Sequence, residues 1–360
     1  MIFERAARRE FVHAAIGISV ALLAILTSTQ LIRLLNDAAG GRVAPEAVLA
    51  LLGFAALNFM PVLLSLTLFV AILLSLSRAY RDSEMVVWFS SGLPLTAWVR
   101  PVLKFALPLV VAIAALSAML SPWANYRSAE YKERLSTRND TSQVTPGAFR
   151  EAKKGERVVF VEAMADDASK VRNVFVTSMQ QGKLGVVMAA TGHQETLANG
   201  DRFMVLENGR RYEVEPGTPE FKIMEFERYG FRTEDSQAKP ADRSPSRLPL
   251  WDLLSEDSRE NRGELVWRVG VPVSAFILAL LAIPLSYVNP RAGRSANMLI
   301  AILIYAIYSN LLSMSQAWVT QGKLSFWVGI WAVHGVMLVP LSLLFYRRIV
   351  LRFPWKRGRG

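Results

Sequence analysis

The stretch VLALLGFAALNFMPVLLSLTLFVAILLSLS, from Val48 to Ser77, contains no Asp, Glu, Lys or Arg. A helix that rises about 1.5 Å per residue needs about 20 mostly apolar residues to cross roughly 30 Å of hydrocarbon. Pro61 lies inside the stretch, but a membrane helix tolerates proline because neighbouring helices satisfy the freed backbone groups. The stretch is therefore predicted to be a transmembrane helix.

Windows of similar length and polarity occur elsewhere and predict six spans in total: Phe11–Leu35, Val48–Ser77, Thr96–Leu120, Leu265–Val288, Ala296–Trp318 and Leu324–Tyr346. The first is too long for the core of a signal peptide and lacks a small-residue cleavage site, so it is predicted to remain as an anchor. The chain is 52% hydrophobic and 20% charged, which indicates that a membrane part and a water-exposed part share its 360 residues.

Lys and Arg are concentrated on one side of the predicted spans. That side carries Arg5, Arg8, Arg9, Arg78, Arg81, Arg291, Arg294, Arg347, Arg348, Arg352, Lys356, Arg357 and Arg359, whereas the other short loops carry little beyond Arg33, Arg42 and Lys323. Because positive loops stay in the cytoplasm, both termini are predicted to be cytoplasmic. The formal charge of +11 thus indicates a membrane surface, and no nucleic acid, as the partner.

The long segment between the third and fourth spans, about Pro122 to Gly263, changes from helical to alternating periodicity. The predicted strands, rich in Val, Phe, Met and Thr, are 157–164, 171–179, 184–191, 202–207, 211–215 and 221–231. Asn199-Gly200 and Asn208-Gly209 are typical of hairpin turns, because both central residues of a type I′ turn need positive φ. The segment is predicted to be an antiparallel sandwich or open barrel, followed by a proline-rich linker and a short amphipathic helix at 250–264.

The predicted fold class is thus an α+β membrane protein with a 3+3 arrangement of spans around an external antiparallel β-domain. Residues 1–121 hold the first three spans and 122–263 the β-domain with its linker. Residues 264–346 hold the last three spans, and 347–360 form a basic cytoplasmic tail.

Motifs for the commonest hydrolytic reactions are missing from the sequence. It contains no G-x-x-x-x-G-K-[ST], no H-E-x-x-H, no G-x-S-x-G and no Cys, so it offers no recognisable site for hydrolysing ATP, peptides or esters. The predicted span interiors also lack Asp and Glu, which an ion-coupled transporter normally needs. The chain is therefore predicted to be a non-catalytic subunit without a metal or cofactor of its own, and a partner would have to supply the energy for any transport.

Three polar residues in or near the spans have alternative interpretations. His13 and His334 are more simply explained as hydrogen-bonded packing residues than as proton relays. Arg33 follows Gln30 by three residues, so the two lie on roughly the same helix face. Arg33 is either an interfacial anchor or a cation for an anionic headgroup, and its position alone leaves both open.

The loop from Arg78 to Pro94, R-A-Y-R-D-S-E-M-V-V-W-F-S-S-G-L-P, is predicted to be cytoplasmic and to contain a short helix. Asp82 or Ser83 can cap the start of this helix, and Gly92 followed by Pro94 ends it.

The apolar residues Met85 to Phe89 give this predicted helix a surface that needs something to pack on. That surface either lies on the membrane or docks into a cytoplasmic partner. In the second case Trp88 and Phe89 would be the anchors and Glu84 a charged contact, and the spacing alone leaves the two cases open.

Motifs along nearly the whole chain resemble one known family. They are E-R-A-x-R-R-E at Glu4–Glu10, Q-L-I-R at Gln30–Arg33, S-E-M-V-V-W-F-S-S-G-L at Ser83–Leu93, G-H-Q-E-T-L at Gly192–Leu197, and P-L-S-Y-V-N-P-R-A-G-R at Pro284–Arg294. In their order, and with the 3+3 pattern of spans around a β-domain, they resemble the LptF/LptG family of permease subunits of the bacterial lipopolysaccharide export ABC transporter. The last motif is the most discriminating and resembles the LptF branch of that family.

The resemblance implies a bacterial inner-membrane complex with several partners. An LptG-like permease would pair with this chain, a dimer of LptB-like ATPases would bind ATP and magnesium below, and an LptC-like jellyroll protein would attach on the periplasmic side. The β-domain would be a periplasmic β-jellyroll. Members of the family extract lipopolysaccharide from the outer leaflet of the inner membrane and pass it towards the outer membrane.

The resemblance also implies roles for the residues singled out above. Arg33 matches a basic position that faces the phosphates of the lipid, and Gln30 beside it departs from the Lys of some members, which reduces the local positive charge. Glu84 matches the carboxylate of a coupling helix that contacts the ATPase, and Met85, Trp88 and Phe89 belong to the same helix. The alternative from a different class is a membrane-anchored periplasmic sensor or assembly scaffold, which would need a cytoplasmic output module.

Overall fold

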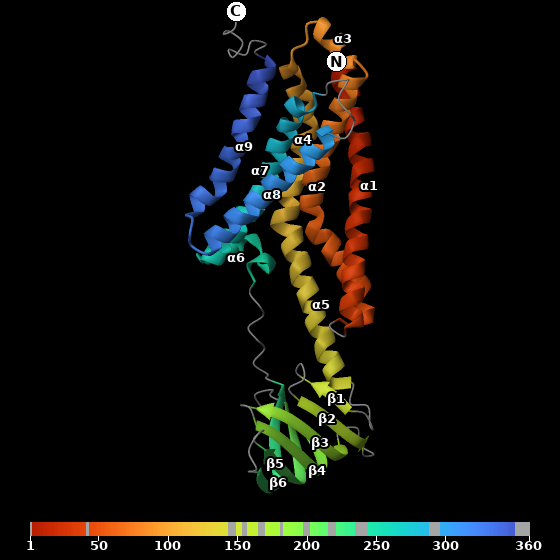
Figure 1. Cartoon of the computed structure of the whole chain (residues 1–360), viewed down its shortest axis with the longest axis vertical. Coiled ribbons are helices and arrows are strands. Elements are labelled where there is room, and N and C mark those ends of the chain that lie inside the picture. Colours follow the sequence, from red (N-terminus) through yellow and green to blue (C-terminus); the bar gives the residue numbers. More distant parts are fainter. Residues whose placement is uncertain are drawn as a thin grey trace, which may run out of the picture. The chain divides into compact units, whose positions relative to one another are not determined.

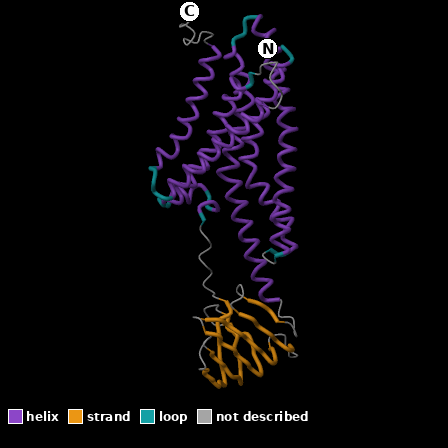
Figure 2. Tube along the Cα trace, in the orientation of Figure 1, coloured by secondary structure: helices purple, strands orange, loops and turns teal. Residues whose placement is uncertain are grey.

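The computed structural model describes residues 2–40, 43–142, 149–152, 157–164, 170–180, 183–196, 202–214, 221–234, 244–287 and 296–349. The chain divides into two compact units. A helical unit comprises Met1–Leu135 and Arg243–Gly360, and a β-unit comprises Ser136–Asp242. Helices and strands are separated almost completely between the two units, as Figures 1 and 2 show.

Six helical segments among the described residues are long and apolar enough to cross a membrane. They are α1 (Ile2–Ala39), α2 (Val48–Arg81), α4 (Val99–Ala115) continued through a π-turn into α5 (Ser121–Ser142), α7 (Arg259–Leu285), α8 (Ala296–Thr320) and α9 (Phe326–Ile349). The six predicted spans are confirmed. The third helix continues beyond the predicted span, because the π-turn Leu116–Leu120 carries the helix past Pro122 into α5.

The described part of the helical unit also contains five short helices: η1 (Pro45–Ala47), α3 (Glu84–Ser90), η2 (Leu95–Trp98), η4 (Pro245–Arg247) and α6 (Leu250–Ser255). The single helix predicted at 250–264 is wrong, because α6 ends at Ser255 and α7 starts afresh at Arg259. Ser258 is the N-cap of α7, and its hydroxyl accepts a hydrogen bond from the backbone N–H of Asn261 (3.1 Å). A serine at this position favours a helix start over a helix interior.

The helical unit is built around α2 and α7. The most apolar windows of these helices are 67% and 72% buried within the chain, whereas that of α1 is only 6% buried. The core includes Leu68, Ile72 and Leu76 of α2 packed with Leu278 and Ala282 of α7. α1, α8 and α9 leave most of their apolar surface to lipid or to another protein.

An ion pair between the buried Arg268 and the partly buried Glu264 lies in the first three turns of α7. Arg268 donates from Nε to Oε1 of Glu264 (2.9 Å), and its Nη2 donates to the carbonyls of Pro245 (3.0 Å) and Leu248 (2.9 Å). Glu264 lies just before the predicted fourth span but inside α7. Its charge is matched by Arg268, so this pair fastens the segment that enters the helical unit from the β-unit.

The two histidines proposed as packing residues are both hydrogen-bonded. Nδ1 of His334 lies 2.7 Å from the hydroxyl of Tyr308, and both side chains are buried. Nδ1 of His13 lies 2.7 Å from the carbonyl of Arg9, one turn earlier in α1.

The β-unit contains one six-stranded antiparallel sheet in which the strands neighbour one another in chain order. The strands are β1 (Phe149–Ala152), β2 (Arg157–Met164), β3 (Lys170–Gln180), β4 (Lys183–Thr196), β5 (Arg202–Val214) and β6 (Phe221–Glu234). An antiparallel β-domain between the third and fourth spans is therefore confirmed. A core of Val174, Val176, Val187, Ala189 and Leu206 holds the sheet together.

The hairpin predicted at Asn208-Gly209 is wrong, because β5 runs unbroken from Arg202 to Val214 and pairs with β4 and β6 on both sides of this dipeptide. Asn208 does have the positive φ (52°) that suggested a turn. Here that conformation interrupts the pairing with β4 and β6 at a single position and leaves the register unchanged on both sides. Asn199-Gly200, the other predicted hairpin, lies outside the described residues.

Candidate functional site

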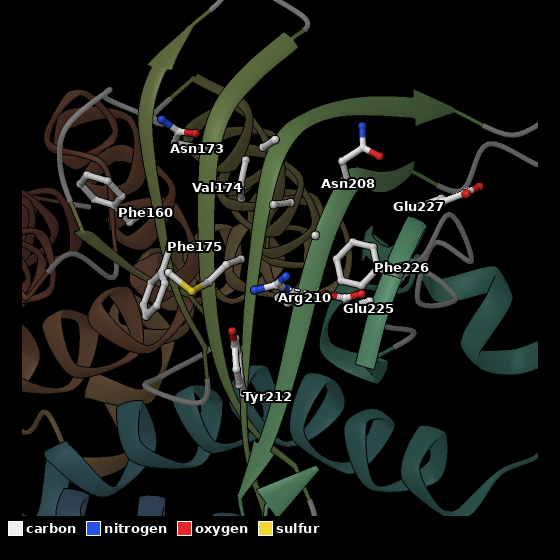
Figure 3. A pocket seen from close by; sticks show the side chains of 14 residues that line it. Phe160, Asn173, Val174, Phe175, Asn208, Arg210, Tyr212, Glu225, Phe226 and Glu227 are labelled. Atoms are coloured by element: carbon white, nitrogen blue, oxygen red, sulfur yellow. Dashed lines mark hydrogen bonds and ion pairs between the residues drawn. The ribbon is translucent and has the colours of Figure 1, made fainter. Parts of the chain in front are cut away.

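A groove of about 1080 Å³ lies in the β-unit and is lined by residues of β2 to β6 (Figure 3). Phe160, Phe175 and Met188 are direct cross-strand partners on neighbouring strands. Directly opposed residues of antiparallel strands point to the same side of the sheet, so these three side chains form one apolar row. The groove therefore has an apolar wall with the size of a ligand-binding site.

A line of interrupted pairing crosses the sheet along this groove. Asn173 of β3 has a φ of 49° and Asn208 of β5 a φ of 52°. The pairings that flank Asn173 and Asn208 place Ala190 of β4 between them, and all three line the groove. Asn adopts positive φ more readily than most residues, which explains its place at these two positions.

The far end of the apolar row is charged. Arg210 is the cross-strand partner of Met188, and its Nε donates to Oε1 of Glu225 on β6 (2.7 Å). This hydrogen bond raises the pKa of the Arg210 guanidinium above its usual value, so the group stays protonated. Tyr212 lies further along β5 in the same groove. The site thus offers an apolar wall bordered by an ion pair.

The two candidate substrate-binding residues lie on α1, in the other unit. Arg33 is exposed and Gln30 half-buried, and both lie in the last three turns of the helix. Because this helix is little covered by its own chain, Arg33 is available to a ligand or to a neighbouring protein.

The predicted helix in the loop between the second and third spans is α3, Glu84–Ser90. Ser83 stands at its N-cap with φ 60°, but its hydroxyl makes no capping hydrogen bond. Gly92 has φ 88°, and the N–H groups of Gly92 and Leu93 donate to the carbonyls of Phe89 (3.0 Å) and Trp88 (3.2 Å). This is the Schellman pattern, so the predicted helix end at Gly92 is confirmed.

The structure divides the apolar residues of α3 into two sets. Met85 is only 1% exposed and belongs to the core of the helical unit, and Trp88 packs against the same core. Val86 and Val87 are 63% and 64% exposed, and Phe89 is 40% exposed. Met85 and Trp88 thus hold the helix to its own chain, whereas the valines, which were not singled out from the sequence, form its outer surface together with the exposed Glu84.

An aromatic contact chain connects α3 with two helices of the C-terminal half. The ring of Phe89 lies 6.2 Å from that of Tyr80, which lies 5.5 Å from that of Tyr287 after α7. The guanidinium of Arg348, near the end of α9, lies 3.8 Å from the centre of the Tyr287 ring. The sequence did not predict the contacts that run from Phe89 through Tyr80 and Tyr287 to Arg348, because no local pattern connects residues so far apart in the chain.

Comparison with known proteins agrees with this architecture. The family described as lipopolysaccharide export system permease LptF/LptG matches residues 5–347. The chain belongs to the LptF/LptG family. Curated relatives named lipopolysaccharide export system permease protein LptF, from Escherichia coli K12 and from Shigella flexneri, are each 27% identical over 363 residues, covering 100% of this chain and 98% of the relative.

Membership of the LptF/LptG family, together with six apolar helices, makes this chain a multi-pass inner-membrane permease of lipopolysaccharide export. Of the motifs that carried the resemblance, Glu4–Glu10, Gln30–Arg33 and Ser83–Leu93 lie on α1 and around α3. Most of Pro284–Arg294 lies outside the described residues.

Proposed function

We propose that this chain is the LptF-like subunit of an ATP-driven exporter and that it passes lipopolysaccharide through its own β-domain. The observation that carries the proposal is the groove of about 1080 Å³, whose wall includes Phe160, Phe175 and Met188. A solidly packed β-domain would offer no such path. The proposal rests on this groove together with the family of the chain.

The energetic reason for a groove is the cost of exposing acyl chains to water. Each exposed methylene costs about 0.8 kcal/mol, so an acyl chain of about 12 methylenes costs roughly 10 kcal/mol. An apolar wall in the β-domain offsets most of that cost. The ion pair of Arg210 and Glu225 at one end of the apolar row would face the polar part of the lipid, because burying a charged pair under acyl chains is unfavourable.

In this proposal the work is done by an LptB-like ATPase dimer, which holds ATP and magnesium, while this chain is non-catalytic. The outer surface of α3, formed by Glu84, Val86 and Val87 with part of Phe89, would seat in the ATPase. Met85 and Trp88 would transmit the movement into the helical unit, since they are packed in its core. The outer side of α3 would then be buried in the ATPase and its inner side in the helical unit. Packing on both sides suits a short helix to transmit force.

The sparsely covered α1 and α8 would pack against an LptG-like permease, and Arg33 with Gln30 would face the lipid phosphates between the two permeases. A guanidinium suits this role because it binds phosphate through two hydrogen bonds at once. The termini and α3 would be cytoplasmic and the β-unit periplasmic, where an LptC-like protein would receive the lipid.

Co-expression with candidate LptG-like and LptB-like proteins tests this function. We expect the three proteins to purify as one complex and mass spectrometry to find lipopolysaccharide bound to it. A matched sample with ATP and magnesium added should lose bound lipid when an LptC-like acceptor is present. A stable complex with a kinase or a cell-wall synthase, without the ATPase, would instead support a sensor or scaffold.

A further inference from the structure

A second groove, of about 980 Å³, lies in the helical unit at the N-terminal end of α1 and the C-terminal end of α2. It is separate from the lipid path proposed above, because its lining includes neither a residue of the β-unit nor Arg33 or Gln30. Its charged wall consists of Arg9, Glu10, Arg78 and Arg81. Three guanidinium groups therefore face a single carboxylate.

The single carboxylate is already engaged. Oε1 of Glu10 accepts a hydrogen bond from Nη2 of Arg78 (2.6 Å), and Asp82, outside the groove, lies 3.7 Å from Nε of the same arginine. In the part of the chain that the structure describes, no carboxylate pairs with Arg9 or Arg81. Nε of Arg81 donates only to the carbonyl of Ser77 at 3.4 Å. The groove thus has a surplus of positive charge.

The other wall of the groove is apolar. It is formed by Leu73 and Leu74 of α2 and by Met298 at the start of α8. Leu73 precedes Arg81 by eight residues, which is about 12 Å along a helix that rises about 1.5 Å per residue. Small side chains, including Ala6 and Ala14 of α1, keep the space between the walls open.

The groove thus has cations at one side and apolar side chains about 12 Å away. A phospholipid has the matching arrangement of an anionic headgroup and apolar acyl chains. Arg9 and Arg81 lie near the ends of two membrane-spanning helices, where a headgroup phosphate would lie, and the acyl chains of the lipid would extend towards Leu73 and Leu74. Basic pockets between transmembrane helices commonly bind anionic headgroups in this way.

We infer that this groove binds an anionic glycerophospholipid from the leaflet next to the chain termini, with Arg9 and Arg81 on its phosphate. A free phosphate ion would satisfy the cations but not the apolar wall, and a zwitterionic lipid would bring a positive group close to them. The groove therefore selects lipids of net negative charge.

Native mass spectrometry of the full chain in its complex tests the inference, with phosphatidylglycerol and phosphatidylcholine offered in mixed micelles. The wild-type protein should retain phosphatidylglycerol in preference to phosphatidylcholine. Arg9→Gln with Arg81→Gln should weaken that retention about 25-fold, because each cation near an anionic lipid is worth roughly fivefold. Ala6→Phe, which fills the groove without changing charge, should also weaken it.

The matched control is Arg5→Gln with Arg8→Gln, which also removes two positive charges, both from the N-terminal end of α1, at residues that do not line the groove. It should retain phosphatidylglycerol to within about twofold of wild type. The inference would be overturned if this control lost as much phosphatidylglycerol as the groove variant, or if the wild type retained the two lipids equally. It would also be overturned if inorganic phosphate displaced phosphatidylglycerol, or if a groove variant lost the ATPase while retaining the lipid.

Discussion

The two sets of apolar residues on α3 predict opposite effects of truncation on how firmly this helix is held to the helical unit. Met85 is 1% exposed and packed in the core, whereas Val87 is 64% exposed. Replacing a buried Met by Ala costs about 2–5 kcal/mol, because the transfer energy of the lost atoms adds to that of the cavity. The same truncation at an exposed site usually changes the free energy of unfolding by less than about 0.5 kcal/mol.

Met85→Ala should therefore release α3 from the helical unit, whereas Val87→Ala should leave the helix docked. The assay is hydrogen exchange on the solubilised complex, read at the amides of Ser91 and Leu93, whose hydrogen bonds close the helix end. A local cost of about 2–5 kcal/mol corresponds to exchange faster by roughly 30-fold to several thousandfold. Each variant is also scored for ATPase association.

We expect Met85→Ala to accelerate exchange and to uncouple ATP hydrolysis from lipid release. Val87→Ala should keep wild-type exchange and weaken ATPase association. The reasoning is refuted if Met85→Ala leaves exchange at the helix end unchanged, or if Val87→Ala accelerates it as much.

Three further predictions concern Arg33, Glu84 and the β-unit. Arg33→Glu should reduce co-purified lipopolysaccharide and lipid-stimulated ATPase activity while complex assembly persists. The change replaces the guanidinium that we propose binds phosphate with a carboxylate, which repels phosphate. Glu84→Lys should weaken ATPase association, and a compensating charge change on the ATPase should restore part of it. Gly209→Val should destabilise the β-unit by at least about 1–3 kcal/mol, measured by proteolysis, because a Cβ there would lie 2.3 Å from the carbonyl of Met188 and 2.5 Å from Cζ of Phe226.

Each of these predictions has an outcome that contradicts it. Wild-type lipid content in Arg33→Glu would make Arg33 an interfacial anchor only. Normal association and lipid release in Glu84→Lys would leave the carboxylate no role beyond stabilising its own helix at the first turn. Unchanged protease resistance in Gly209→Val would mean that β5 can move away from β4 at this position.

The helices were predictable because their signal is strong and local. A stretch such as Val48–Ser77 has only one stable structure in a bilayer, where every backbone group must be paired within the helix. The end of α3 at Gly92 was equally predictable, because positive φ at a helix end is readily adopted by glycine.

The strand course at Asn208-Gly209 was not predictable from local chemistry. The same dipeptide supports either a hairpin turn or an irregularity within a strand, because both require positive φ. The choice depends on partners elsewhere. β4 and β6 pair with β5 on both sides of Asn208, and a hairpin at this dipeptide would break that continuous pairing.

The helix at α3 was predictable from the sequence, but the direction in which each of its side chains points was not. The run of apolar residues from Met85 to Phe89 predicted an apolar surface on this helix, yet only the fold shows that Met85 faces inwards and Val86 outwards. The basic groove was likewise not predictable from the sequence. Arg9 and Arg81 are far apart in the chain and line the same groove only because α1 packs on α2.

Site-specific photocrosslinking in the assembled transporter tests the central claim most directly. A photoreactive residue replaces Phe175, which lines the groove, or Met224, which is 42% exposed on β6 and lies outside it. We predict that lipopolysaccharide is captured at Phe175 only when ATP is supplied and is not captured at Met224. Capture at Met224 but not at Phe175, or no capture at either position during active export, would contradict the passage of lipid through this groove.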